Sequence, residues 1–148
     1  MEHDMYMKMA LIQAEHAFAD NEIPIGCIIV DKDGIIIGSS RNKTFAGGKL
    51  LCHAEIMAID EACKNVGDWR LTEATMYVTI EPCPMCAGAI LMARIPTVVF
   101  GAKNPKAGCA GSLYNLLDDS RFNHRATVIH GVLAAECGDM MTRFFRKK

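Results

Sequence analysis

Two short stretches of the sequence carry residue types that bind metals and transfer protons. His53-Ala54-Glu55 offers an imidazole and a carboxylate, and Pro82-Cys83-Pro84-Met85-Cys86 offers two thiols. One His and two Cys make three zinc ligands, one fewer than a closed structural site uses, so water or substrate is left to fill the fourth position. A carboxylate beside such a water is placed to transfer protons. The two stretches therefore predict a hydrolytic zinc enzyme.

The spacing of the two thiols explains how they could act together. Cys83 and Cys86 are three residues apart, which places both sulfurs on one face of a helix. In the first turn of that helix, unpaired N–H groups and the helix dipole favour thiolate over thiol. His53 offers one ring nitrogen, and the sequence does not indicate which.

Glu55 is the residue that we assign as the proton carrier. Two thiolates cancel the formal charge of Zn²⁺, so the bound water should be less acidic than on a zinc held by three His, and a nearby base becomes more necessary. Residues i and i+2 do not share a face of an ideal helix. The long Glu55 side chain and an irregular helix end would still let the carboxylate reach the site.

A lone C-x-x-C also occurs in structural zinc sites and redox motifs, so the other thiols have to be weighed. They are Cys27, Cys52, Cys63, Cys109 and Cys137. Cys27 lies in an expected strand, and Cys63 and Cys137 lie on apolar helix faces, which favours core packing for all three. Cys52, next to His53, is the most credible fourth ligand, but we favour the open site with three ligands.

Length indicates one ordinary domain spanning residues 1–148, and the two motifs predict that this domain depends on zinc. The chain is 51% hydrophobic and 22% charged, and its net charge of −1 gives no sign of nucleic-acid binding. Seven Cys is an odd number, and no apolar signal segment precedes the first expected helix, so we predict reduced thiols in a cytoplasmic protein. No apolar run approaches the roughly 20 residues that a membrane span requires.

Apolar periodicity and turn residues predict alternating helices and strands. We expect a helix at 4–19, strands at 23–30 and 35–39, a helix at 53–65, a strand at 75–80, a helix at 82–94, a strand at 97–101, a short helix at 113–117, a strand at 126–130 and a C-terminal helix. Asp31-Lys32-Asp33-Gly34 has the composition of a hairpin turn. Continuous apolar runs predict that the first two strands are covered on both faces.

This order of elements predicts a layered α/β domain with a mixed sheet. The helices at 53–65 and 82–94 are apolar around most of their circumference, so we expect the first to be largely buried and the second to lie in the core or in a subunit interface. Both metal-binding motifs fall at the N-terminal ends of these helices. That rim of an open α/β sheet is where ligands usually bind.

At these positions the chain resembles the zinc-dependent deaminases, whose signature pairs H-x-E with P-C-x-x-C. A closer likeness, to bacterial tRNA-specific adenosine deaminases that convert wobble adenosine to inosine, runs from about Asn21 to Phe145. Its specific stretches are residues 53–58, 77–89, 99–102, 111–113, 122–125 and 144–145. The zinc motif alone would also fit cytosine, guanine or nucleotide deaminases, and the later stretches favour the tRNA branch.

The resemblance implies a three-layer α/β/α cytidine-deaminase-like fold with a central mixed five-stranded sheet. It also implies a homodimer, one Zn²⁺ per subunit and a tRNA anticodon stem-loop as substrate. Its implied site residues are His53, Cys83 and Cys86 for zinc, Glu55 for catalysis, and Asn42, Ala54 and Phe145 for substrate binding. The basic residues Arg143, Arg146, Lys147 and Lys148 match the region that meets neighbouring anticodon bases.

Two other functions remain open from the sequence. The first is a deaminase of free guanine or cytosine, which a near-neutral net charge mildly favours. The second is a non-catalytic binding module stabilised by a zinc with four protein ligands. The basic C-terminal tail could create a local patch that the net charge hides.

Overall fold

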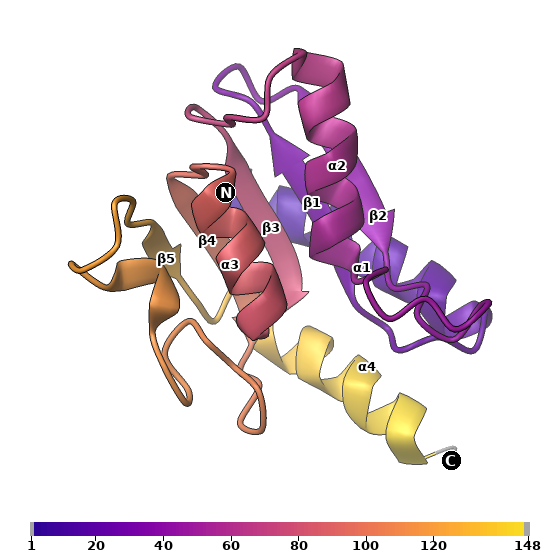
Figure 1. The fold of residues 1–148 in the computed structure, drawn as a ribbon. Coiled ribbons are helices and arrows are strands. Elements are labelled where there is room, and N and C mark those ends of the chain that lie inside the picture. Colours follow the sequence, from indigo (N-terminus) through magenta and orange to yellow (C-terminus); the bar gives the residue numbers. More distant parts are fainter. Residues whose placement is uncertain (1, 147–148) are drawn as a thin grey trace.

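The computed structural model describes residues 2–146, whose helices and strands alternate in the predicted order (Figure 1). The elements are α1 (Glu2–Ala19), β1 (Gly26–Val30), β2 (Ile36–Arg41), α2 (Ala54–Val66), β3 (Thr75–Ile80), α3 (Pro84–Met92), β4 (Thr97–Ala102), the 3₁₀ helix η1 (Leu116–Asp118), β5 (Thr127–Ile129) and α4 (Ala134–Arg146). In this part of the chain, no helix combines the length and apolar character that crossing a membrane requires.

The strands form one mixed sheet in the order β2-β1-β3-β4-β5. β1 pairs antiparallel with β2 and with β3, and the β3–β4 and β4–β5 pairs are parallel. The predicted mixed sheet is therefore confirmed. Because β3 and β4 are parallel, the chain leaves both at the same edge of the sheet, and the helix after β3 begins there.

Helices cover both faces of the sheet, which confirms the three-layer α/β/α arrangement. α2 and α3 lie on the face toward the viewer in Figure 1, while α1 lies behind the sheet and contacts α4. Alternate residues of β1 divide between the two cores, as the period of a strand requires. Cys27 and Ile29 join the core under α2 and α3, whereas Ile28 and Val30 join the core under α1.

Several element boundaries differ from the prediction, most of them by one or two residues. β1 begins at Gly26 rather than Ile23, and Pro24 in the omitted segment has no N–H to offer a ladder. α3 begins at Pro84 rather than Pro82, because Cys83 keeps an extended backbone as the N-cap. The short helix is a 3₁₀ turn at Leu116–Asp118 instead of residues 113–117.

The prediction that both hairpin strands are covered on both faces is wrong for β2. β1 is buried throughout, but β2 is the edge strand, and buried residues alternate with more exposed ones along it. The turn between the strands places Gly34 at φ +80, which is the left-handed conformation expected for glycine in a hairpin turn.

The prediction that α2 is largely buried is also wrong. Its buried residues are Ala54, Glu55, Ala58 and Ala62, all on the side that faces the sheet. The apolar side chains of Ile56, Met57 and Ile59 are only partly covered, because no other described segment lies over the outer side of the helix. α3 likewise leaves Met92 73% exposed.

Candidate zinc centre and active site

The three predicted zinc ligands come from the starts of two neighbouring helices. His53 is the N-cap of α2 and Cys83 is the N-cap of α3, both with extended backbone, and Cys86 lies in the first turn of α3. α2 and α3 contact each other, and their starts lie at the same end of the front layer (Figure 1). Residues 30 positions apart in sequence therefore meet at the rim of the sheet.

The spacing of the three ligand atoms fits a tetrahedral zinc ion. His53 Nδ1 lies 3.6 Å from Cys83 Sγ and 3.5 Å from Cys86 Sγ. Ligand bonds of about 2.0 Å to nitrogen and 2.3 Å to sulfur, at a tetrahedral angle, place these atoms about 3.5 Å apart. The structure also identifies Nδ1 as the ring nitrogen that faces the thiols.

Within residues 2–146, the group of possible metal ligands at this point contains His53, Cys83 and Cys86 and no fourth protein side chain. Cys52 is outside the group although it precedes His53 directly. A set of two thiols and one imidazole is the donor set of a catalytic zinc site, which keeps one position for water or substrate. The geometry thus favours an open zinc site over a closed structural one.

The two thiols differ in their electrostatic state. The hydrogen bond from Cys86 lowers the pKa of the Cys83 thiol to about 5, with further help from the backbone N–H groups of Cys86 and Met85. The same hydrogen bond, together with burial, raises the pKa of Cys86. Without a metal ion, Cys83 is therefore the more acidic of the two thiols, and binding of a metal ion would displace the proton that they share.

Glu55 reaches the cluster from the first turn of α2. It is 4% exposed, and its carboxylate is hydrogen-bonded to the Cys86 side chain. Burial raises the pKa of the Glu55 carboxyl to about 7, and the hydrogen bonds only partly oppose this rise. A carboxyl group with a pKa near neutrality can both accept and return a proton, which is the property a general acid–base residue needs.

Asn42 and Ala54 lie together beside this cluster. Asn42, which is 2% exposed, accepts a hydrogen bond from the backbone N–H of Ala54 at 2.8 Å through Oδ1. This bond uses the first free N–H of α2 and fixes the orientation of the Asn42 amide. Nδ2 of Asn42 makes no hydrogen bond to any residue in the range 2–146, so it remains available as a donor.

The third expected substrate-binding residue lies outside the zinc cluster. Phe145 is 52% exposed near the C-terminal end of α4, and its ring packs edge-on against Phe144. Arg143 in the same turn pairs with Asp139 at 3.0 Å. The expected basic residues Lys147 and Lys148 lie outside the described residues.

Sequence reasoning missed two buried carboxylates that hold the loops on either side of the site. Glu22 accepts hydrogen bonds from the backbone of residues 45–46, in the loop that follows Asn42. Glu81 accepts hydrogen bonds from the loop after β4. One signal was present in the sequence, since Glu81 is an acidic residue that directly follows a largely buried strand.

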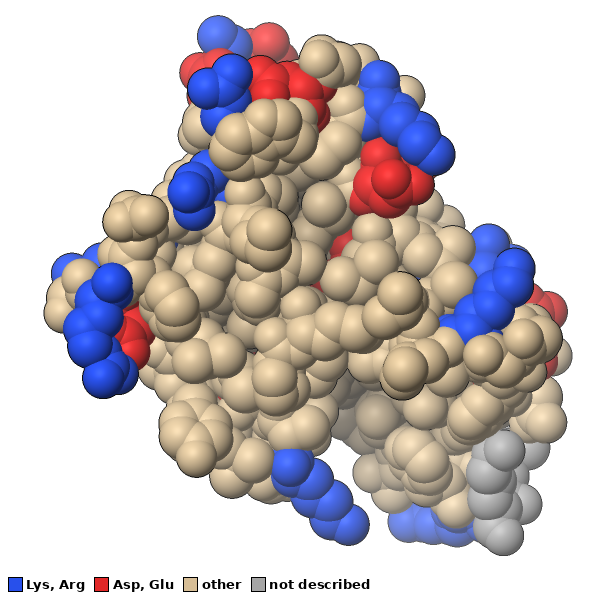
Figure 2. All heavy atoms as spheres, viewed as in Figure 1, with Lys and Arg blue, Asp and Glu red and all other residues tan. Residues whose placement is uncertain are grey.

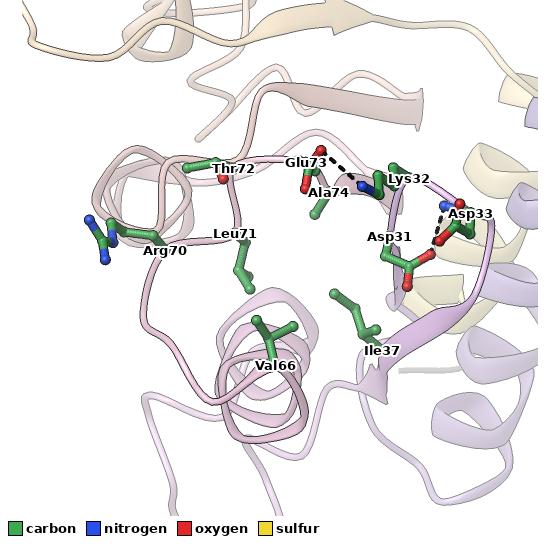
Figure 3. A pocket seen from close by; sticks show the side chains of 10 residues that line it. All are labelled: Asp31, Lys32, Asp33, Ile37, Val66, Arg70, Leu71, Thr72, Glu73 and Ala74. Carbon is green, nitrogen blue, oxygen red and sulfur yellow. Dashed lines mark hydrogen bonds and ion pairs between the residues drawn. The ribbon is translucent and has the colours of Figure 1, made fainter.

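A cavity of about 230 Å³ lies at the opposite edge of the sheet from the zinc cluster. Figure 3 shows Ile37, Val66 and Leu71 lining it between the hairpin turn and the segment before β3. Lys32 and Glu73 form an ion pair of 3.7 Å across its margin. Its lining includes none of the predicted site residues, so the chemistry is expected at the zinc cluster instead.

Comparison with known families agrees with the fold and the donor set. The family model for the cytidine and deoxycytidylate deaminase zinc-binding region matches residues 1–102, which include all three candidate zinc ligands. The arrangement described above is thus that of a zinc-dependent deaminase.

Comparison with individual relatives shows to which group of zinc-dependent deaminases the chain is most similar. The tRNA-specific adenosine deaminase of Bacillus subtilis is 51% identical over 97% of this chain and 89% of its own length. A solved structure from a study of A-to-I editing by tRNA:A34 deaminases matches with a TM-score of 0.87 and 38% identity, over 92% of this chain and 98% of its own. The guanine deaminase of Bacillus subtilis matches less fully, with a TM-score of 0.65 and 37% identity over 70% of this chain and 66% of its own. This chain belongs to the tRNA-specific adenosine deaminases.

The zinc assignment predicts a specific loss of metal. We expect one zinc per chain in the purified protein, and a Cys86→Ser variant should lose most of it because a neutral hydroxyl is a much weaker zinc ligand than a thiolate. Cys137→Ser is the matched control, since Cys137 is equally buried but lies on α4. Elemental analysis of both variants tests this, and stoichiometric zinc in Cys86→Ser would contradict the assignment.

Proposed function

We propose that this protein is a zinc-dependent hydrolase that deaminates adenosine to inosine at the wobble position of a tRNA anticodon. The observation that carries the proposal is the cluster of His53, Cys83 and Cys86 with the buried Glu55 carboxylate hydrogen-bonded to it. We further propose that residues 1–148 act as a single zinc-dependent deaminase domain. The reaction breaks the C–N bond of a cyclic amidine, consuming water and releasing ammonia.

The site residues divide the chemistry between them. Zinc bound by His53, Cys83 and Cys86 would activate a water molecule for attack on C6 of adenine. Glu55 accepts the proton that this water gives up, because its carboxylate lies against the ligand cluster. Glu55 passes this proton to N1 of the base, and it then carries the second proton of the water, taken from the new hydroxyl on C6, to the departing amino group. Ammonia leaves and inosine remains, so that one water is consumed for each ammonia released.

Asn42 and Ala54 are proposed to hold the target nucleoside as a pair. The Ala54 N–H orients the Asn42 amide, and Asn42 Nδ2 is left to donate a hydrogen bond to the nucleoside. Phe145, half exposed on α4, is proposed to meet a neighbouring anticodon base, since unstacked bases of RNA loops commonly stack on aromatic side chains.

The charge of the two loops beside the site supports an RNA substrate. Residues 41–53 and 103–115 contain no Asp or Glu. Their exposed basic residues are Lys43, Lys49, Lys103 and Lys106, whereas Arg41 ends β2 and forms an ion pair of 3.2 Å with Asp20. Basic side chains around the mouth of a site attract the phosphates of a nucleic acid, even in a protein whose net charge is −1. A net charge of −1 therefore does not favour a small neutral substrate over RNA, because the loops beside the site are locally positive.

The outer faces of α2 and α3 are proposed to form a homodimer interface. Met92 and Trp69 are 73% and 58% exposed, and they line one shallow apolar hollow with Ile59 and Cys63. Figure 2 shows this face of the molecule with an almost uncharged middle and charged side chains around its margin. An apolar patch within a polar rim is typical of a subunit interface, and a second copy of the chain carries the same patch.

We also propose that the protein acts in the cytoplasm. All seven cysteines are free, as expected for a reducing compartment, and a tRNA substrate would be encountered there.

The choice of substrate can be tested directly. A tRNA anticodon stem-loop with adenosine at the wobble position should release ammonia and accumulate inosine, whereas the same loop with guanosine there should not react. Free guanine is the alternative substrate that should be assayed beside the stem-loop, because the guanine deaminase of Bacillus subtilis resembles this chain. Faster release of ammonia from guanine, cytosine or free adenosine than from the stem-loop would contradict the proposal.

A Glu55→Gln variant should keep its zinc and lose deamination by a factor of roughly 10² to 10⁴, because the amide cannot carry a proton. Glu15→Gln, which changes an exposed carboxylate on α1, serves as the control and should retain activity. Zinc content and inosine formation are measured on the same samples. Retained activity in the zinc-loaded Glu55→Gln variant would remove Glu55 from the mechanism.

A Met92→Glu variant should dissociate the proposed homodimer, because it places charges in the middle of an apolar interface. Sedimentation of the unaltered protein should give twice the mass of one chain, and the variant should give the mass of one. Met5→Glu is the matched control, since Met5 is 49% exposed on α1, in the opposite layer. A monomeric unaltered protein, or dissociation by both variants, would refute the interface.

A further inference from the structure

The loop that follows β4 is held by one buried carboxylate. Glu81, 2% exposed at the end of β3, accepts backbone hydrogen bonds from Asn104 at 3.0 Å and from Ala110 and Ser112 at 2.9 Å each. The Ser112 hydroxyl donates a fourth hydrogen bond to it. The Glu81 side chain is therefore hydrogen-bonded to both ends of the loop, at residues that lie 23 and 31 positions later in the sequence.

The loop is packed directly against that carboxylate. Gly108 lies so close to Glu81 that a Cβ at this position would collide with the carboxylate carbon. The neighbouring Cys109 donates its N–H to the carbonyl of Pro82 at 2.9 Å. Because Pro82 directly precedes the ligand Cys83, these contacts attach the loop to the turn that binds zinc.

The other side of the loop faces solvent and carries positive charge. Lys103 and Lys106 are exposed, whereas residues 108–110 are buried. Asn104 Oδ1 accepts hydrogen bonds from the N–H groups of Lys106 and Ala107, which closes a turn between the two lysines. Glu81 binds the N–H of Asn104, the residue between them, so the position of both lysines depends on it.

We propose that Glu81 is a positioning residue for the RNA substrate. It fixes the segment 103–112 to the zinc-binding turn, so that Lys103 and Lys106 meet phosphates that flank the target adenosine. Fixed cations bind phosphates at a lower entropic cost than cations on a mobile loop, because the loop is already ordered before binding. This inference rests on the proposed function, since the lysines need a polyanionic substrate.

The charge of Glu81 suits this role better than a neutral side chain would. A carboxylate is an acceptor at both oxygens, and four donors converge on it here. Glutamine has the same shape but one oxygen, so its amide N–H₂ would face backbone N–H groups that also need an acceptor. Glu81→Gln therefore releases part of the loop while the side-chain volume is conserved.

Glu22 provides a matched comparison on the other side of the site. It is also buried, and it accepts backbone hydrogen bonds from Phe45 at 2.9 Å and Ala46 at 2.7 Å. Glu22→Gln should loosen residues 45–46 and leave the segment 103–112 protected. Amide hydrogen exchange on the zinc-loaded proteins distinguishes the two effects by position.

The kinetic test uses the zinc-loaded enzyme and an anticodon stem-loop. Glu81→Gln should raise KM by roughly tenfold and change kcat by less than about threefold, because phosphate contacts are lost while the reacting groups stay in place. Exchange of the Asn104, Ala110 and Ser112 amides should become faster. Ser112→Ala, which removes one of the four donors and keeps the three backbone bonds, should give a much smaller rise in KM.

A double-mutant cycle separates positioning from a general structural role. If Glu81 acts through the lysines, adding Glu81→Gln to a Lys103→Ala, Lys106→Ala background should raise KM little further. The proposal would be overturned if Glu81→Gln and the lysine substitutions raised KM by factors that multiply. It would also be overturned if Glu81→Gln made the loop exchange faster but left KM unchanged, or if this variant lost its zinc. A wild-type enzyme that fails to deaminate the stem-loop would instead refute the proposed function.

Discussion

The meeting of two helix N-termini at one edge of the sheet is the constraint on which the site depends. β3 leads into α3, and α2 begins beside it, so His53 and Cys83 become the caps of neighbouring helices. The N–H groups in the first turn of a helix have no carbonyl partner within the helix, so they can donate hydrogen bonds to an anion. The pKa of the Cys83 thiol is lowered mainly by the hydrogen bond from the Cys86 side chain, and the backbone N–H groups of Cys86 and Met85 lower it further. The fold therefore supplies both the proximity of the ligands and part of their charge state.

Burial gives the carboxylates near the site two different functions. Glu55 has few donors around it, and its pKa is raised to about 7, which suits proton transfer. Glu81 also has little exposed surface, but its hydrogen-bond donors outweigh the cost of burial and lower its pKa, so it remains an anion that organises a loop. The same residue type thus acts as a proton carrier or as a fixed anchor according to its donors.

The sequence predicted the features that depend on neighbouring residues. The limits of β3 were predicted to the residue, because Thr75–Ile80 is a run of residues with high β-propensity that Glu81 and Pro82 follow directly. The roles of Glu22 and Glu81 could not be predicted, since the N–H groups they accept come from loops more than twenty residues away. Nor could the partial exposure of Ile56 and the exposure of Met92 be predicted, because apolar periodicity alone does not show whether another segment covers an apolar helix face.

The net charge of −1 is a poor guide to the field that a substrate meets. Within residues 2–146, the buried charged residues are all carboxylates, namely Glu22, Glu55 and Glu81. Backbone N–H groups satisfy Glu22 and Glu81, and these groups come from the two loops that carry lysines and no acidic residue. The negative charges of Glu22 and Glu81 are therefore held beneath these loops and partly balanced by peptide dipoles, while the lysines lie on the outer side of the loops. This separation allows a nearly neutral chain to present a basic rim around its zinc site.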